Sequence, residues 1–155
     1  MKSSYVDRQL AYVDYVFREI DKWPLDPYIE SLIAQYLAAL ICGIYEDAIE
    51  HILDEFAQKT TTSIEIKNFI SNSVSNSFRN PDQGNIKRLL KLFNPLWGAQ
   101  LDGKLQSSHW EALDTIRLNK DRVAHGTESK ITYPQIKHLY QDSKKIIEEI
   151  DSIIL

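Results

Sequence analysis

The segment Arg117–Gly126, which reads R-L-N-K-D-R-V-A-H-G, says most about the fold and function of this 155-residue chain. Apolar residues three and four positions apart lead into it, and a glycine follows its histidine directly. This pattern predicts the last turns of an amphipathic helix that stops at Gly126, because glycine adopts the left-handed conformation that ends helices. His125 is therefore expected in the last helical turn.

Helical spacing of apolar residues covers nearly the whole chain. It predicts helices over residues 10–20, 27–56, 64–78, 86–93, 110–123 and 133–154, with Asp26 and Ser63 as N-caps. Turn formers over residues 94–98 are expected to end the fourth of these helices. Gly43 is expected either to let a neighbouring helix approach closely or to bend its own helix. The predicted fold class is all-α, an up-and-down bundle of five to six helices in a single domain over residues 1–155.

Composition excludes several kinds of protein. The net charge of -4 gives no global attraction to nucleic acid, so any phosphate-binding surface must be a local patch. Cys42 is the only cysteine, which excludes an intrachain disulfide and a thiolate zinc cluster. His51, His109 and His138 have no acidic partners at ligand spacing and are expected to be surface or packing residues, so neither a metal nor another cofactor is expected. The polar start and the absence of an apolar run of membrane-spanning length predict a cytoplasmic protein without a membrane association.

Five blocks of this sequence, in order, resemble the RiboL-PSP-HEPN branch of the HEPN superfamily. They are Cys42–Leu53, Asn80–Ile86, Leu92–Trp97, Leu113–Ile116 and Asn119–Gly126. The resemblance implies an all-α fold, homodimerisation and, in many members, metal-independent cleavage of RNA. It also implies a context of bacterial defence or of a toxin system, with a protein partner encoded nearby.

The usual pattern of the family is an arginine, often followed by asparagine, then three residues and a histidine. His125 takes the histidine position of that pattern. Lys120 and Asp121 stand where the arginine and the asparagine are usual, so this sequence departs from the family at both positions. Glu46 falls on the acidic position of the second helix.

Metal-independent cleavage needs a proton acceptor or donor and positive charge at the phosphate. His125 suits the first task, and both the negative helix end and Asp121, four residues earlier, favour its protonated form. Lys120 and Arg122 are the candidates for the second task. Five positions separate Lys120 from His125, about 140° around a regular helix, so the two converge only if the helix loosens or a partner subunit completes the site.

The remaining polar residues are expected to support this centre. Asp121 weakens phosphate binding unless Arg117 or Arg122 pairs with it. Glu46 either holds one of these two arginines in place or is simply exposed, and Asn119 belongs to the same segment.

Two functions are consistent with these residues. The first is a homodimeric ribonuclease with a shared active-site cleft. The second is a non-catalytic HEPN module that binds RNA or a protein partner, which the departures at Lys120 and Asp121 favour. On that reading His125 only satisfies the last carbonyls of its helix, and the charges around it form a solvated face.

Overall fold

The computed structural model describes residues 1–127, 129 and 131–155, and these residues form helices and no strand. The all-helical class is therefore confirmed, although the described residues form seven helices rather than five to six. In chain order the helices are α1 (Ser4–Ile20), α2 (Pro27–Thr60), α3 (Ile64–Ser77), α4 (Gln83–Phe93), α5 (Trp97–Lys104), α6 (Ser107–Ala124) and α7 (Tyr133–Ile154).

The additional helix is α5, within a stretch that the sequence predicted only as a helix end. Asn94 caps the preceding turn, since its Oδ1 accepts the N–H of Leu96 at 2.9 Å. The chain then starts a second short helix whose two buried residues, Trp97 and Leu101, are four positions apart. With eight residues and two glycines, α5 has a weak helical signal in sequence, and burial of Trp97 and Leu101 stabilises it instead.

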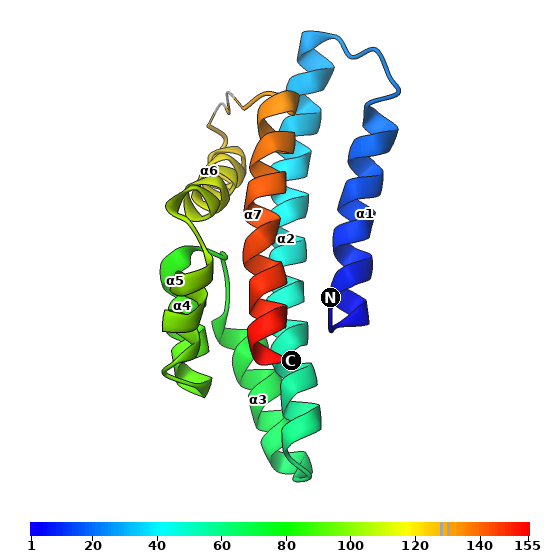
Figure 1. Cartoon of the computed structure of the whole chain (residues 1–155). Helices are drawn as coiled ribbons and strands as arrows, with labels where there is room; N and C mark the ends of the chain where they lie inside the picture. The colour runs from blue at the N-terminus through cyan, green and yellow to red at the C-terminus, as the bar shows by residue number, and fades with distance from the viewer. Residues whose placement is uncertain (128, 130) are drawn as a thin grey trace.

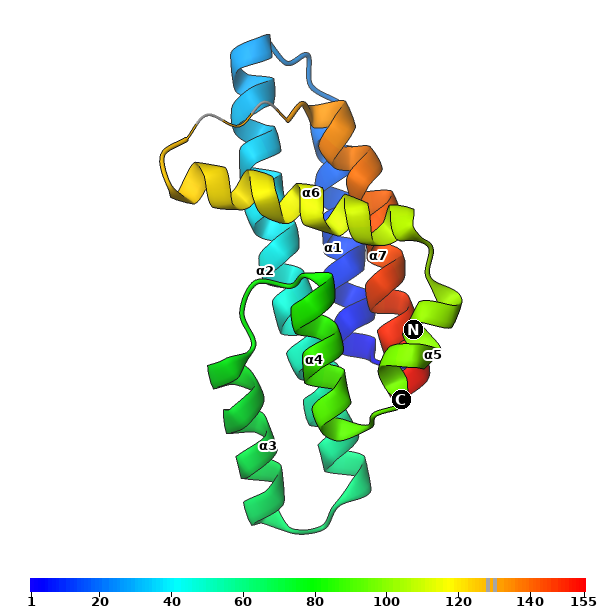
Figure 2. The same ribbon diagram turned by 90° about the vertical axis from the view of Figure 1, so that its left-hand side faces the viewer.

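The long helices α1, α2 and α7 lie side by side along the length of the molecule (Figures 1 and 2). Helix α6 does not follow this direction but crosses α2 and α7 steeply (Figure 2), and it packs against both of them. Helix α3 turns back along the C-terminal half of α2, and α5 packs against α4 and α7. The C-terminal end of α6 therefore projects from the side of the bundle, beyond the helices that it crosses.

Helix α2 forms the centre of the fold. Twelve of its residues are buried, and it packs against α1, α3, α6 and α7. By length and composition α2 could also cross a membrane. This differs from the expectation that no apolar run reaches that length. Half of the most apolar window of α2 is buried in the bundle. A helix that is covered by neighbours on several sides also needs apolar residues around most of its circumference, so its composition alone does not indicate a membrane span. Gly43 is exposed with open space around it, so no helix approaches closely there.

Capping residues fix where the helices begin. The Asp26 carboxylate accepts the N–H groups of Tyr28 and Ile29 at 3.0 and 3.1 Å, and the Ser63 hydroxyl accepts that of Ile66 at 3.3 Å, as the sequence predicted. Helix α1 has Ser3 as its N-cap without a side-chain cap bond, and a distant residue holds the segment just before it instead. The carboxylate of Asp151, on α7, accepts the N–H groups of Lys2 at 2.6 Å and Ser3 at 2.8 Å.

Candidate functional site

Helix α6 ends in a hydrogen-bonded motif built around Gly126. The helix stops at Ala124, His125 follows as its C-cap, and Gly126 has φ +67. The N–H of Gly126 donates to the carbonyl of Val123 at 3.1 Å, and that of Thr127 donates to the carbonyl of Arg122 at 2.8 Å. These two bonds are the pair that closes a Schellman motif. The predicted helix stop at Gly126 is thus confirmed, and His125 lies one residue beyond the helix rather than within its last turn.

The imidazole of His125 is exposed at this projecting helix end. Among the described residues, no hydrogen bond or ion pair involves its ring. The Asp121 carboxylate was expected to favour the protonated form of His125. Its ion-pair partners are Arg117 and Lys120 instead. The carbonyl ends of α6 still surround His125 with negative potential. The ring is therefore accessible to a ligand from solvent.

Lys120 and Asp121 belong to a charged cluster between α2 and α6. The guanidinium of Arg117 donates to Asp121 Oδ2 at 2.8 Å, and the ammonium of Lys120 lies 3.8 Å from Asp121 Oδ1. Arg117 therefore compensates the negative charge of Asp121, one of the two pairings that the sequence allowed. Lys120 also donates to the side-chain carbonyl of Asn80. The contacts with Asn80 and Asp121 thus hold the Lys120 ammonium in place, whereas the side chain of a lysine without partners on a helix is mobile.

Glu46 takes part in this cluster through Asn80. The Glu46 carboxylate is half-buried on α2, and its Oε1 accepts the backbone N–H of Asn80 at 2.8 Å. Neither alternative for Glu46 holds: its carboxylate is half-buried rather than exposed, and its partner among the described residues is the backbone N–H of Asn80 rather than Arg117 or Arg122.

Asn80 connects three parts of the fold. It has φ 55, in the left-handed region, and its carbonyl accepts from Asn85 Nδ2 at 3.0 Å. Its N–H reaches Glu46 on α2, and its side chain reaches Lys120 on α6. The residue was not predicted as part of the site. The available signal was an asparagine before a proline in a run of turn formers, since asparagine tolerates the left-handed conformation better than most residues.

Beneath this cluster lies the buried thiol of Cys42. Burial raises its pKa to about 12, and the charges of Lys120, Glu46 and Asp121 act on it as weaker influences. The thiol therefore stays protonated at neutral pH and is a packing group rather than a nucleophile.

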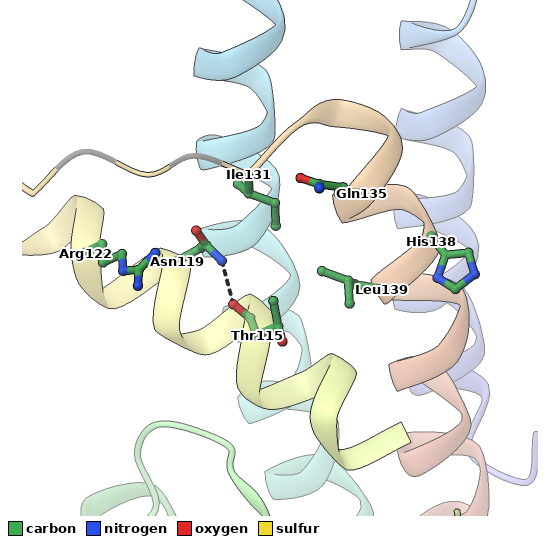
Figure 3. Close-up of a pocket in the computed structure, with 7 residues that line it drawn as sticks. All are labelled: Thr115, Asn119, Arg122, Ile131, Gln135, His138 and Leu139. Atoms are coloured by element: carbon green, nitrogen blue, oxygen red, sulfur yellow. Dashed lines mark hydrogen bonds between the residues drawn. The ribbon is translucent and has the colours of Figure 1, made fainter. Parts of the chain in front are cut away.

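Arg122 and Asn119 face the other side of α6, toward α7. They line an open cleft of about 390 Å³, together with Thr115 on α6 and Ile131, Gln135, His138 and Leu139 on or before α7 (Figure 3). Asn119 is only 7% exposed, and its amide donates to the Thr115 carbonyl at 2.8 Å while its carbonyl accepts from the Ser129 hydroxyl at 2.8 Å. Asn119 thus anchors Ser129, after the end of α6, whereas Arg122 is exposed at the cleft wall.

The predicted catalytic residues therefore divide between two faces of α6. Lys120 turns to Asn80 and Asp121, whereas Arg122 lines the cleft next to α7. Arg122 is three residues before His125 and shares its side of the helix end, because residues three and four apart are neighbours on a helix. By this spacing Arg122 is the better-placed cation for His125 within one chain, whereas the Lys120 ammonium is engaged with Asn80 and Asp121.

No group of three or more His, Cys, Asp or Glu side chains among the described residues is arranged to hold a metal ion. The other histidines have local partners. The ring of His51 stacks on Tyr5, with centroids 3.7 Å apart, His109 Nδ1 accepts the N–H of Gln106 at 3.0 Å, and His138 lies 3.3 Å from Asp142.

Comparison with known proteins identifies one family. No curated protein and no solved structure gives a significant match to this chain. The family model described as RiboL-PSP-HEPN matches residues 7–155, nearly the full length, and includes both the charged cluster around Asn80 and the exposed His125. The chain therefore belongs to the RiboL-PSP-HEPN family.

Proposed function

We propose that this protein is a metal-independent ribonuclease that acts as a homodimer, with His125 as its acid or base. The observation that carries the proposal is the exposed imidazole of His125 at the projecting end of α6, one turn from the Arg122 guanidinium, in a chain of the RiboL-PSP-HEPN family. An imidazole titrates near neutral pH, and a guanidinium binds phosphate oxygens through paired donors.

The reaction would use the RNA's own 2′-hydroxyl as nucleophile. The 2′ oxygen forms a bond to the adjacent phosphorus while the bond from phosphorus to the 5′ oxygen breaks. One proton leaves the 2′-hydroxyl and one is taken up by the 5′ oxygen, so an imidazole that accepts or donates a proton lowers the barrier. Arg122 stabilises the charge that builds up on the phosphate. The products are a 2′,3′-cyclic phosphate and a 5′-hydroxyl end.

A second copy of the chain supplies what one chain lacks. Lys120 and His125 point to different sides of α6, and a dimer that faces two such helix ends toward each other brings the Lys120 of one subunit to the His125 of the other. Exposed apolar residues on one face of α2, namely Tyr28, Leu32 and Tyr36, support an association of this kind. They repeat every four residues, and such a stripe on a monomer is usually an interaction surface.

The family supports a proposal for the role in the cell, and the polar start of the sequence supports one for the compartment. We propose a cytoplasmic enzyme of a bacterial defence or toxin system, with a protein partner encoded nearby that restrains it.

The direct test is cleavage of RNA in EDTA by the wild-type protein and by His125→Ala. We expect the variant to lose at least about 100-fold in rate, since acid–base catalysis typically contributes 10²–10⁴-fold. His51→Ala is a matched control, because it removes another exposed histidine outside both the proposed centre and the cleft beside Arg122. Equal cleavage by wild type and His125→Ala, or no cleavage by either, would refute the proposal.

A non-catalytic module that binds RNA or a protein is the second candidate. It is favoured by the engagement of the Lys120 ammonium with Asn80 and Asp121, which leaves less positive charge for a phosphate. The double variant Lys120→Arg plus Asp121→Asn restores the usual family pair. A large gain of ribonuclease activity in this variant, above an inactive wild type, would support the binding role. An active wild type that gains nothing would support the enzyme.

A further inference from the structure

The cleft between α6 and α7 has the size and position of a ligand subsite. Arg122, Asn119 and Thr115 form one wall, and Gln135, His138 and Leu139 form the other, with Ile131 closing one end (Figure 3). Its volume of about 390 Å³ lies in the lower part of the range of small-molecule sites, roughly 300–1,000 Å³.

Most polar groups in this cleft already have hydrogen-bond or ion-pair partners. The Asn119 side chain is bonded at both ends, and the Thr115 hydroxyl donates to the Glu111 carbonyl at 2.7 Å. The Gln135 carbonyl oxygen accepts the N–H of Thr132 at 3.0 Å as part of the cap of α7. His138 Nδ1 faces Asp142 Oδ2 at 3.3 Å.

Donors remain. Among the described residues, neither the Gln135 amide nitrogen nor the Arg122 guanidinium has a hydrogen-bond partner. These two groups face apolar surface from Ile131 and Leu139. A ligand that fits this arrangement carries acceptor oxygens on a flat, partly apolar body. A nucleotide has this chemistry, because its base stacks on side chains while its carbonyl and phosphate oxygens accept hydrogen bonds.

The cleft shares Arg122 with the proposed catalytic centre. Arg122 forms part of its wall and lies three residues, about 4.5 Å of helix rise, before His125, which caps the helix. We propose that the cleft is a subsite for one nucleotide of a single-stranded RNA, the nucleotide next to the phosphate at His125, with Gln135 as a residue that reads it. This inference rests on the proposed ribonuclease function and adds to it the place where the substrate is held.

The substitution Gln135→Glu tests the subsite with little disturbance of the fold. Glutamate keeps the oxygen that caps α7, since glutamate and glutamine serve equally at this position of a capping box. It replaces the donor nitrogen by a second, negatively charged acceptor. Gln141→Glu is the matched control, because it makes the same change on the same helix at an exposed position outside the cleft.

Binding is measured with a short fluorescent single-stranded RNA of mixed sequence, by anisotropy, in the His125→Ala background so that the RNA stays intact. We expect Gln135→Glu to raise Kd on the order of tenfold, through a lost hydrogen bond and an added repulsion, and Gln141→Glu to change it less than about twofold. Equal Kd values for the two variants overturn the subsite.

Activity separates this inference from the proposed function. If wild type cleaves RNA and His125→Ala does not, while Gln135→Glu and Gln141→Glu bind alike, the ribonuclease stands and the subsite fails. If wild type does not cleave but Gln135→Glu alone weakens binding, the cleft is a nucleotide site of a binding module and the ribonuclease fails. If wild type does not cleave the RNA and no protein in the series binds it, both fail.

Discussion

Replacing Gly126 by alanine should destabilise the fold, whereas the same replacement at Gly43 should stabilise it. Gly126 has φ +67 in the Schellman motif that ends α6, and Gly43 lies inside α2 without a positive φ. A Cβ added at either position meets no atom within 4 Å, so the two substitutions differ in backbone conformation and not in crowding.

The expected magnitudes follow from that difference. An alanine held in the left-handed region costs roughly 1–2 kcal/mol, and part of this is offset by the smaller conformational freedom of the unfolded chain, so we expect Gly126→Ala to lose about 1 kcal/mol. Alanine in a helix interior is favoured over glycine by about 1 kcal/mol, which is the gain expected for Gly43→Ala. For a chain of this length each change moves Tm by about 2–4 °C, in opposite directions.

Urea unfolding followed by far-UV circular dichroism measures both free energies, and unchanged m-values would show that the variants unfold as the wild type does. Shifts of the same sign would contradict this prediction, since the two backbone conformations alone determine the expected signs. A stabilised Gly126→Ala would mean that α6 does not end in the left-handed turn described here. The position of His125 would then need revision as well.

Three further predictions concern the backbone at Asn80, the carboxylate of Asp151 and the thiol of Cys42. Asn80→Gly should unfold near the wild-type temperature, whereas Asn80→Ala should lose about 1–2 kcal/mol, because alanine is strained at φ 55 and glycine is not. Similar losses for the two variants in calorimetry would contradict this. Asp151→Ala should lose about 3 kcal/mol in urea unfolding, since it leaves the buried N–H of Ser3 without its acceptor, and a loss below about 1 kcal/mol would count against the cap. The Cys42 thiol, whose pKa burial raises to about 12, should react with iodoacetamide only as the chain unfolds; rapid labelling of native protein would show that it is accessible.

Local patterns predicted most of the fold. The caps at Asp26 and Ser63 and the stop at Gly126 follow from residues within four positions of one another, which sequence spacing describes well. Helix α5 was missed because a short segment with two glycines has little intrinsic helical preference, and burial of Trp97 and Leu101 decides its structure. The close helix contact expected at Gly43 was also wrong, since the position is open to solvent. The alternative, a bend of α2 at Gly43, stays a prediction.

In the candidate site, too, the sequence predicted contacts within one helical turn and missed contacts between distant residues. The pairing of Arg117 with Asp121 spans one helical turn and was among the alternatives that the sequence allowed. The bonds from Asn80 to Glu46 and to Lys120 join residues 34 and 40 positions apart, so they depend on how α2, α6 and the segment between α3 and α4 pack. The same packing turns Lys120 away from Arg122 and creates the cleft beside α7. No spacing rule in the sequence contains that information.

The ends of the cleaved RNA show most directly whether this protein is a metal-independent ribonuclease that depends on His125. A labelled RNA is incubated in EDTA with wild type and with His125→Ala, and the new 3′ ends are identified by mass spectrometry. The account predicts 2′,3′-cyclic phosphate ends from the wild type and a loss of at least about 100-fold in their rate of formation by His125→Ala. Intact RNA with both proteins, or the same ends formed at the same rate by both, would contradict it.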